Sequence, residues 1–454
     1  MFTSINPATG ETIAEYPAIT TPELRTTLRA SEKAWLQWRR TSFADRSALL
    51  RRAGTLLRER ADRYGRLMAL EMGKPIAAGR AESEKCATAC DYYAEHGERF
   101  LGDVPIATDA SRSYVHHEPI GALLAVMPWN FPFWQVLRVA APTLMAGNVM
   151  LLKHAANVPG CAIALEELFR DAGFPAGVFT NLPIDHTQLK LAIRHSAVRA
   201  VTLTGSAGAG SAVAKEAGQR LKKSVLELGG SDPYIILEDA DLELAVEACV
   251  TSRLINSGQS CIAAKRFVVV DAVRAQFEER FVARMAAART GDPLDETNTV
   301  GPLARRDLRD TLQGQVAQST ARGARALLGG TIPAGSGAFY PPTVLTNVAK
   351  GMAVYAEETF GPVAAIIPVK NERAAIKVAN DSAFGLGAAV FTRDTARGER
   401  IAATDIAAGS CFVNAYVRSD ARLPFGGIKE SGYGRELGPD GIREFVNVKT
   451  VYVR

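Results

Sequence analysis

The chain has 454 residues, of which 47% are hydrophobic and 22% are charged, and its formal net charge is +5. A chain of this length exceeds one ordinary hydrophobic core, so we expect two large α/β domains. The net charge is mild and no block of Lys or Arg could follow the phosphates of a duplex, which argues against a nucleic-acid partner.

The first twenty residues have no basic segment followed by an apolar one, as a secretory signal would, so we expect a cytoplasmic protein. Prolines and polar residues interrupt the most apolar region, residues 119–153, which predicts a buried segment and no membrane span. Six scattered cysteines favour free thiols over a disulfide framework. Cys86 and Cys90 lie four apart in a helical pattern, but no matching pair elsewhere completes a metal site, so we expect no metal.

The N-terminal part, residues 21–100, has apolar residues at helical spacing and predicts an all-helical lead-in. Short apolar runs then alternate with amphipathic segments such as residues 160–172. We expect buried strands at residues 123–127, 149–152, 178–182 and 200–204. This alternation is typical of a parallel, doubly wound sheet.

A second alternating set begins near Ser224 and predicts a second α/β domain. Its expected strands cover residues 234–237, 266–270, 364–369, 388–392 and 410–413. Two polar segments, residues 106–118 and 445–454, alternate as exposed strands do. We expect another subunit to cover such edge strands.

Cys261 ends a Gly- and Ser-rich loop, Asn256-Ser257-Gly258-Gln259-Ser260-Cys261, which precedes the strand expected at residue 266. Loops on a rigid scaffold present reactive groups. A thiolate attacks an aldehyde to give a thiohemiacetal, whose carbon can release a hydride. The alternative is a buried structural thiol, which is the better interpretation for Cys249 and Cys411.

Two polar residues in apolar surroundings are further candidates. Glu227 lies between two leucines and precedes Gly229 and Gly230, so burial would raise its pKa and suit a general base. A satisfied core carboxylate is an equally good interpretation of Glu227 alone. Asn130, in Pro128-Trp129-Asn130-Phe131-Pro132, offers an amide donor for a developing oxyanion, with the Cys261 backbone N–H as its partner.

The segment Gly205-Ser206-Ala207-Gly208-Ala209-Gly210 follows an expected strand and opens a helix. Its backbone N–H groups and the helix dipole could hold a pyrophosphate. The segment does not match G-x-G-x-x-G, and a Gly-rich turn in this place is often only a turn.

Taken together, these motifs resemble the aldehyde dehydrogenase superfamily over nearly the whole chain, most closely its compact bacterial NAD(P)-dependent succinate-semialdehyde dehydrogenases. The resemblance rests on the following motifs in order: Ile5 to Glu11, Leu70 to Pro75, Pro128 to Pro132, Gly205 to Gly210, Glu227 to Gly230, Gly258 to Cys261, Glu357 to Pro362 and Pro424 to Gly432. So many motifs in the right order are very specific.

The resemblance implies two doubly wound α/β domains, a Rossmann-like cofactor domain and a catalytic domain, with a small β oligomerisation arm. Residues 1–105 and 119–226 would form the cofactor domain and residues 227–436 the catalytic domain. Residues 106–118 and 437–454 would supply the oligomerisation strands of a homodimer or a dimer of dimers.

By resemblance, Cys261 is the nucleophile, Glu227 the general base and Asn130 the oxyanion donor. Residues at cofactor-binding positions are Trp129, Lys153, Ala156, Gly205, Ser206, Gly210, Leu228, Glu358 and Phe360. The family usually has Lys-Pro-Ser-Glu where this chain has Lys153-His154-Ala155-Ala156. Ala156 leaves room for a 2′-phosphate that Lys153 can pair, so we expect NADP to be preferred and NAD also to be used.

Arg138 and Ser419 match positions that hold the substrate carboxylate in succinate-semialdehyde dehydrogenases, and Ser260 is a third candidate substrate residue. We therefore expect succinate semialdehyde to be oxidised to succinate. A second arginine of that group is replaced by Ile255, and Arg253, Arg418 or Arg422 could compensate for it. In the alternative, Arg138 pairs an internal carboxylate and the substrate is another aliphatic or aromatic aldehyde.

Overall fold

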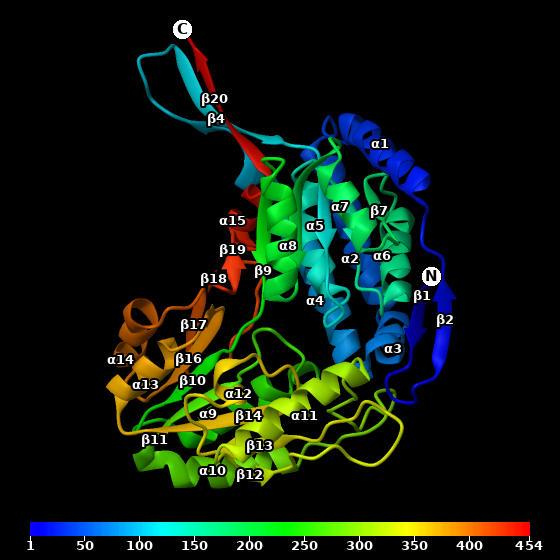
Figure 1. Ribbon diagram of the computed structural model, residues 1–454. Coiled ribbons are helices and arrows are strands. Elements are labelled where there is room, and N and C mark those ends of the chain that lie inside the picture. The colour runs from blue at the N-terminus through cyan, green and yellow to red at the C-terminus, as the bar shows by residue number, and fades with distance from the viewer.

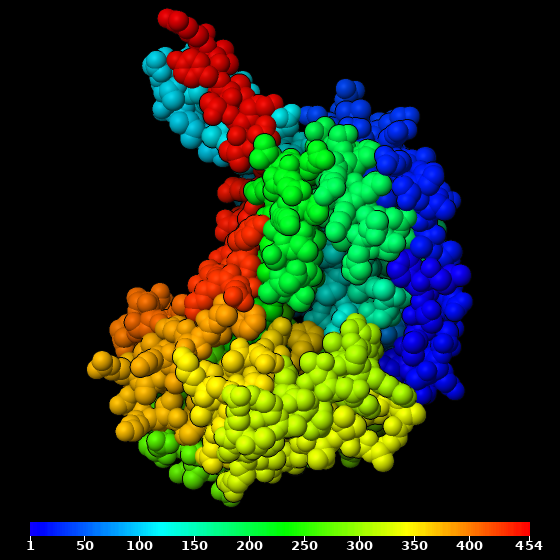
Figure 2. All heavy atoms as spheres, in the orientation of Figure 1, coloured from blue at the N-terminus to red at the C-terminus, as the bar shows by residue number.

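The computed structural model describes residues Met1–Arg454, which form two α/β domains and a projecting arm (Figure 1). The first domain contains the blue and cyan parts of the chain, the green part before residue 228 and part of the red C-terminal segment, and the second contains the later green, the yellow and the orange parts. The space-filling view shows the two bodies meeting along a broad contact, with the arm extending from the first (Figure 2). No helix is both long enough and apolar enough to cross a membrane.

The lead-in is helical as predicted, after a short hairpin that the sequence analysis did not predict. Thr20 caps the first helix by accepting from the Glu23 N–H, and Glu23 accepts from the Thr20 N–H in return. Ser42 and Asp45 form the same reciprocal pair at the second helix. The elements are β1 (Phe2–Ile5), β2 (Thr12–Tyr16), α1 (Thr21–Trp38), α2 (Phe43–Glu59), α3 (Ala61–Met72) and α4 (Ile76–Leu101).

The first sheet has the strand order β19-β9-β8-β5-β6-β7 and is parallel except for β19. The predicted strands of this domain are confirmed, and β9 is added to them. Its elements are β5 (Ala122–Val126), α5 (Trp134–Met145), β6 (Val149–Lys153), α6 (Pro159–Asp171), β7 (Phe179–Asn181), α7 (His186–Arg194), β8 (Val198–Thr204), α8 (Ala207–Gly218), β9 (Lys223–Glu227) and β19 (Gly432–Tyr433).

The order of these strands reverses between β5 and β8, because the chain builds β6 and β7 on one side of β5 before it returns to β8. In doubly wound sheets, ligands bind at the carboxyl ends of the strands at such a switch point. The loop with Asn130 follows the end of β5, and Gly205 and Ser206 follow the end of β8. The topology thus brings two of the predicted motifs to one edge.

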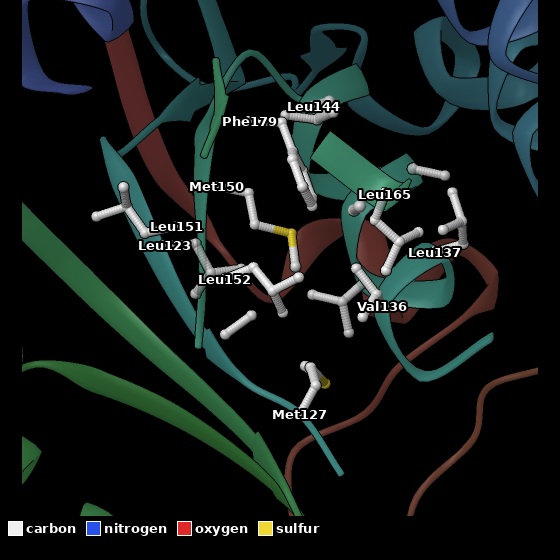
Figure 3. Close-up of a cluster of buried hydrophobic side chains, with 14 of the residues drawn as sticks. Leu123, Met127, Val136, Leu137, Leu144, Met150, Leu151, Leu152, Leu165 and Phe179 are labelled. Carbon is white, nitrogen blue, oxygen red and sulfur yellow. The ribbon is translucent and has the colours of Figure 1, made fainter. Parts of the chain in front are cut away.

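Apolar side chains fill the space between this sheet and its helices (Figure 3). Met150 and Leu152 of β6 point toward Val136 and Leu137 of α5 and Leu165 of α6, and all five are fully buried. Burying a side chain of this size stabilises a fold by about 1.5–3 kcal/mol. The continuous apolar runs that predicted these strands therefore reflect burial on both faces of the sheet.

The second sheet has the strand order β12-β13-β14-β11-β10-β16-β17. All its pairs are parallel except β12 with β13. The five predicted strands are confirmed, and β12 and β13 were not predicted. The elements are β10 (Pro233–Ile236), α9 (Leu242–Leu254), η1 (Ile255–Gly258), β11 (Arg266–Val270), α10 (Asp271–Ala286), α11 (Arg306–Ala321), β12 (Arg325–Leu328), β13 (Thr343–Thr346), α12 (Ala353–Ala356), β14 (Val363–Val369), α13 (Glu372–Asn380), β15 (Phe384–Gly385), β16 (Gly387–Phe391), α14 (Thr395–Arg400), η2 (Ile401–Asp405), β17 (Ser410–Val413) and β18 (Ile428–Lys429).

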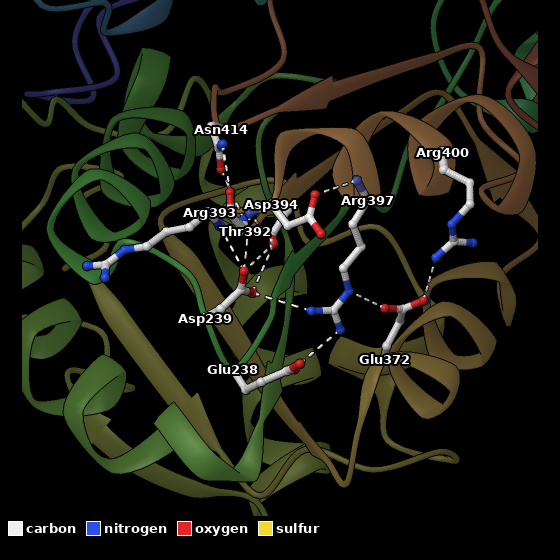
Figure 4. Close-up of polar contacts among 9 residues, drawn as sticks. All are labelled: Glu238, Asp239, Glu372, Thr392, Arg393, Asp394, Arg397, Arg400 and Asn414. Atoms are coloured by element: carbon white, nitrogen blue, oxygen red, sulfur yellow. Dashed lines mark hydrogen bonds and ion pairs between the residues drawn. The ribbon is translucent and has the colours of Figure 1, made fainter.

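A network of hydrogen bonds and ion pairs connects several loops and helices of this domain (Figure 4). Asp239, after β10, accepts from the Thr392 hydroxyl at 2.9 and 2.7 Å. Arg397 of α14 lies between Asp239, Glu238 and Glu372, so it joins the loop after β10 to α13. Partly exposed ion pairs contribute little one by one, but this network fixes several loops at once.

The arm consists of β3 (Val104–Pro105), β4 (Arg112–Pro119) and β20 (Val446–Val453), with β4 in the middle. β4 and β20, which cover most of the two segments predicted as exposed strands, pair with each other along their full length, whereas residues 106–111 lie outside the strands. Residues 437–445, which we assigned to the arm, belong elsewhere, because α15 (Gly438–Arg443) packs on α4 and α5 of the first domain. Two further expectations need correction. The second alternating set does not begin near Ser224, because β9 still belongs to the first sheet. β19 also belongs to the first sheet, although it lies in the range assigned to the catalytic domain.

Candidate active site

A cleft of about 200 Å³ lies where the two domains meet, and residues of both domains line it. It contains most of the predicted site, namely Trp129, Asn130, Gly205, Ser206, Leu228, Cys261, Glu358 and Phe360. These residues come from the ends of β5, β8 and β9, from the loop before β11 and from the loop before β14. The fold therefore brings together motifs that are far apart in the sequence.

The loop that carries Cys261 has an unusual backbone. Asn256 and Ser257 have φ values of 52° and 57°, in the left-handed region that non-glycine residues rarely adopt. Gly258, at φ 77°, lies so close to Gly361 that an added Cβ would approach its carbonyl carbon to 2.3 Å. Only glycine fits this contact, which brings the loop against the segment that follows Phe360.

Two buried cations hold the same loop in place. Lys265 Nζ donates to the carbonyl oxygens of Ser260 at 3.0 Å and Cys261 at 2.7 Å. Arg253 Nη2 donates to the Gly258 carbonyl oxygen at 2.7 Å. Arg253 is thus fully buried in a structural role and does not supply the missing second arginine for a substrate carboxylate. Lys265, which lies four residues after Cys261, was not among the residues predicted from the sequence.

Cys261 is half-buried and lines the cleft, whereas Cys86, Cys90, Cys161 and Cys249 are buried. Burial raises the pKa of the Cys261 thiol to about 12, and the nearby charges of Arg138 and Lys265 oppose this shift. The resting group is therefore a thiol, and its reaction requires loss of the proton. Its exposure to the cleft fits the predicted nucleophile.

Asn130 lies next to the Cys261 loop. The side-chain Nδ2 of Asn130 donates to the Gln259 backbone carbonyl oxygen at 3.1 Å. The backbone carbonyl oxygen of Asn130 accepts from Asn256 Nδ2 at 2.7 Å. A carboxamide nitrogen carries two N–H groups, so the second one is available to the cleft. This arrangement allows the predicted contact with an oxyanion.

Glu227 ends β9, directly before two cleft residues, Leu228 and Gly229. Its side chain is buried and neither carboxylate oxygen has a hydrogen-bond partner. Burial raises the pKa of Glu227 well above the ordinary carboxyl value, and the neighbouring Glu436 raises it further. The carboxyl lies against Gly426 and does not line the cleft. A carboxylate that no donor holds in place can change its side-chain conformation, and a raised pKa makes it a better proton acceptor when it is deprotonated.

Arg138 has an internal counter-ion. Its guanidinium is buried, forms an ion pair with Glu436, and donates to Thr204 Oγ1 at 3.2 Å. It also lies 4.9 Å from the centre of the Phe425 ring. An internal carboxylate as the partner of Arg138 was the alternative considered from the sequence. The ion pair with Glu436 does not support Arg138 as the residue that binds a substrate carboxylate.

A second cavity of about 420 Å³ lies beside α4 and the start of α5, and Ser419 lines it. The Ser419 hydroxyl oxygen accepts from Lys85 Nζ at 2.8 Å and from Trp134 Nε1 at 3.2 Å. Lys85 was not predicted from the sequence, and the burial of its neighbours Glu82 and Cys86 on α4 is seen only in the structure. Ser260, the third candidate substrate residue, is buried and lines neither cavity.

The features of a dinucleotide cradle surround the cleft. Ser206 caps α8 by accepting from the Ala209 N–H at 3.3 Å, while the N–H groups of Ala207 and Gly208 have no protein acceptor. An added Cβ at Gly208 would meet nothing within 4 Å, so the backbone there is open to a phosphate. The rings of Trp129 and Phe360 meet edge to face at 5.7 Å on the wall of the cleft.

The other residues predicted to bind cofactor lie around this cradle. Gly210 allows α8 to pack on Leu228, whose side chain would meet an added Cβ at 2.6 Å. Lys153 ends β6 without a side-chain partner, and burial lowers the pKa of its ammonium group. Ala156 follows in the next loop and lines a small hollow with Ala155. Glu358 accepts from the Gly230 N–H at 3.0 Å, which leaves its other oxygen free. These residues fit a dinucleotide with an additional phosphate near Lys153.

The fold and this cleft are those of a nicotinamide-dependent oxidoreductase. The family model described as "Aldehyde dehydrogenase family" matches residues 1–451, and the chain belongs to this family. This confirms the resemblance seen in the sequence, the two-domain α/β fold and the assignment as an NAD(P)-dependent aldehyde dehydrogenase.

Similar proteins include enzymes with a named substrate. A succinate semialdehyde dehydrogenase [NAD(P)+] of Escherichia coli is 49% identical over 99% of this chain and 97% of that protein. A probable succinate-semialdehyde dehydrogenase [NADP(+)] of Synechocystis is 47% identical over 99% of both chains. The crystal structure of succinic semialdehyde dehydrogenase from Streptococcus pyogenes in complex with NADP+ superposes with a TM-score of 0.97 at 38% identity and covers 100% of both chains.

Proposed function

We propose that this aldehyde dehydrogenase oxidises succinate semialdehyde to succinate and prefers NADP+ as the hydride acceptor. The main observation is that the Cys261 thiol and the Asn130 amide share one cleft with an open helix N-terminus. The similarity over full length to enzymes named for this substrate supports the choice of aldehyde.

In the first half-reaction, the Cys261 thiol gives its proton to water, and the resulting thiolate attacks the aldehyde carbon. The new C–S bond turns the carbonyl oxygen into an oxyanion. The free N–H of the Asn130 amide donates to that oxygen. When bound, the nicotinamide supplies the acceptor for the hydride that leaves the carbon. The product on Cys261 is a thioester.

In the second half-reaction, Glu227 takes a proton from water, and the resulting hydroxide attacks the thioester carbon. The C–S bond breaks, succinate leaves, and the Cys261 sulfur regains a proton. Glu227 acts after its side chain turns from Glu436 toward the cleft, which its missing hydrogen bonds permit. Arg138 keeps Glu436 in place throughout, because the two groups form a buried pair.

The preference for NADP+ is supported by the unpaired ammonium of Lys153 and the short side chain of Ala156. We predict that Ala156→Glu lowers kcat/KM for NADP+ by at least about tenfold, because a carboxylate placed against a 2′-phosphate repels it. The same variant should keep or improve its kcat/KM for NAD+, which has a free 2′-hydroxyl. Steady-state kinetics with each coenzyme measures both values, and an unchanged NADP+ value would contradict the assignment of residues 153–156.

A panel of aldehydes tests the proposed substrate. We expect succinate semialdehyde to exceed butyraldehyde in kcat/KM by at least about 30-fold, because the two differ mainly in a carboxylate that the site must pair. NADPH absorbance follows the reaction. Equal values would favour the second candidate function, oxidation of another aliphatic or aromatic aldehyde, which the internal counter-ion of Arg138 already makes worth testing.

Two further expectations are proposals of the same kind. The arm exposes Val448, Tyr452 and Val453, and such an apolar surface on a projecting sheet suits burial against a second copy, in a homodimer or a dimer of dimers. A cytoplasmic location is supported by the six free thiols, since oxidising compartments favour disulfides.

A further inference from the structure

The second cavity contains a cation without a carboxylate partner. Lys85 lies on α4, which packs side by side with α5 (Figure 1), and its ammonium is half-buried at the wall of the cavity. Its contacts are the Ser419 hydroxyl at 2.8 Å and the face of the Trp134 ring at 4.2 Å. Neither neighbour carries a negative charge, so the ammonium has no counter-ion.

The carboxylates nearest to Lys85 are already taken. Glu82 pairs with Lys74 and accepts from the N–H groups of Phe133 and Trp134 at 2.9 Å. Asp420 receives two hydrogen bonds from the Arg422 guanidinium, at 2.8 and 2.6 Å. Burial and the positive charge of Arg138 together lower the pKa of Lys85 to about 8. A cation in such surroundings gains by binding an anion.

The other arginines near this region are less suitable as carboxylate receptors. Arg138 pairs with Glu436, and Arg422 pairs with Asp420. Arg418 is exposed, and its nearest described contact is the Tyr416 ring at 5.9 Å. Lys85 is therefore the cation of this cavity that has both partial burial and an unmet charge.

Ser419 completes a receptor for a carboxylate. Its oxygen already accepts two hydrogen bonds, from Lys85 Nζ and Trp134 Nε1, so its own O–H is left to donate. An ammonium carries three N–H groups, and Ser419 uses only one of those of Lys85. The Lys85 ammonium and the Ser419 hydroxyl thus offer a carboxylate two hydrogen-bond donors on the wall of the cavity, one of them positively charged.

The receptor and the cleft with Cys261 both adjoin the start of α5. Trp134 lines the second cavity, while the next residue, Gln135, lines the cleft with Cys261. A single ligand bound at both sites would need an aldehyde at one end and a carboxylate at the other.

We propose that Lys85, together with Ser419, binds the distal carboxylate of the substrate and determines the preference for a carboxylated aldehyde. This proposal rests on the proposed function and assigns to Lys85 the role that the sequence analysis gave to Arg138.

The test compares Lys85→Met with Lys190→Met, which removes an exposed lysine of α7 as a matched control. For each enzyme, kcat/KM is measured with succinate semialdehyde and with butyraldehyde. We expect Lys85→Met to lower the value for succinate semialdehyde by at least about 30-fold, mainly through KM, and to leave butyraldehyde within about twofold. Lys85→Arg should retain most of the preference, and Lys190→Met should match the wild-type enzyme.

A Lys85→Gln variant keeps a donor for Ser419 and loses the charge, and it replaces Lys85→Met in the test if that variant does not fold. It should show the same loss of kcat/KM with succinate semialdehyde. A preference in Lys85→Met and Lys85→Gln equal to that of the wild-type enzyme would overturn the role of Lys85 and leave the proposed function standing. Equal losses with both aldehydes would also overturn it, because a structural role affects both substrates. A wild-type enzyme that does not prefer succinate semialdehyde would overturn both proposals.

Discussion

A Cys261→Ala variant is expected to lose NADPH formation by about 10⁴-fold or more, because no other group in the cleft can form the covalent bond with the aldehyde. Binding of NADP+ should persist, since the side chain of Cys261 takes no part in the cradle at α8. An NADPH absorbance assay measures the first effect and a titration with NADP+ the second.

The matched control is Cys411→Ala. Cys411 is also half-buried, and burial raises its pKa to about 12 as well, but it lies in β17 and away from the cleft. This variant should keep the wild-type rate. A Cys261→Ala enzyme with a rate near wild type would remove the basis of the mechanism.

The parts of the fold that the sequence predicted well are those set by local pattern. Continuous apolar runs such as 149–152 predicted strands buried on both faces, and the spacing in residues 21–100 predicted helices. Strands β12 and β13 escaped prediction because β12 is mostly exposed and a Gly- and Pro-rich segment joins the two strands. The short return of β19 to the first sheet depends on a pairing with β9 that no local pattern reveals.

The candidate site divides in the same way. Motif residues such as Asn130, Gly205 and Cys261 met in one cleft because strand ends determine their place. The partners of charged side chains could not be predicted, because they come from remote parts of the chain. Arg138 forms an ion pair with Glu436, which lies near the C-terminus, and Lys85 donates to Ser419, which lies 334 residues later in the sequence. These two pairings moved the expected carboxylate site from one cation to another.

Replacement of Glu227 by Gln is expected to separate the two half-reactions. Cys261 and Asn130 remain intact, so the enzyme should form about one NADPH per active site in a burst. Release of the acid should then slow by about 10²–10⁴-fold, because the amide cannot accept a proton from water. Stopped-flow absorbance shows the burst, and hydroxylamine, which cleaves a thioester without a base, should restore turnover.

The pH dependence of release provides a second, independent measure of Glu227. A general base works in its deprotonated form, and burial and Glu436 raise the pKa of Glu227 well above the ordinary carboxyl value. The rate of release in the wild-type enzyme should therefore rise with pH through a range above that of an exposed carboxyl, and this rise should be absent in Glu227→Gln. The control is Glu166→Gln, since Glu166 is a half-buried carboxyl that also has a raised pKa but lies on α6. Full steady-state turnover in Glu227→Gln, or a block before the burst, would exclude Glu227 as the base and direct attention to Glu436, the next buried carboxyl beside Arg138.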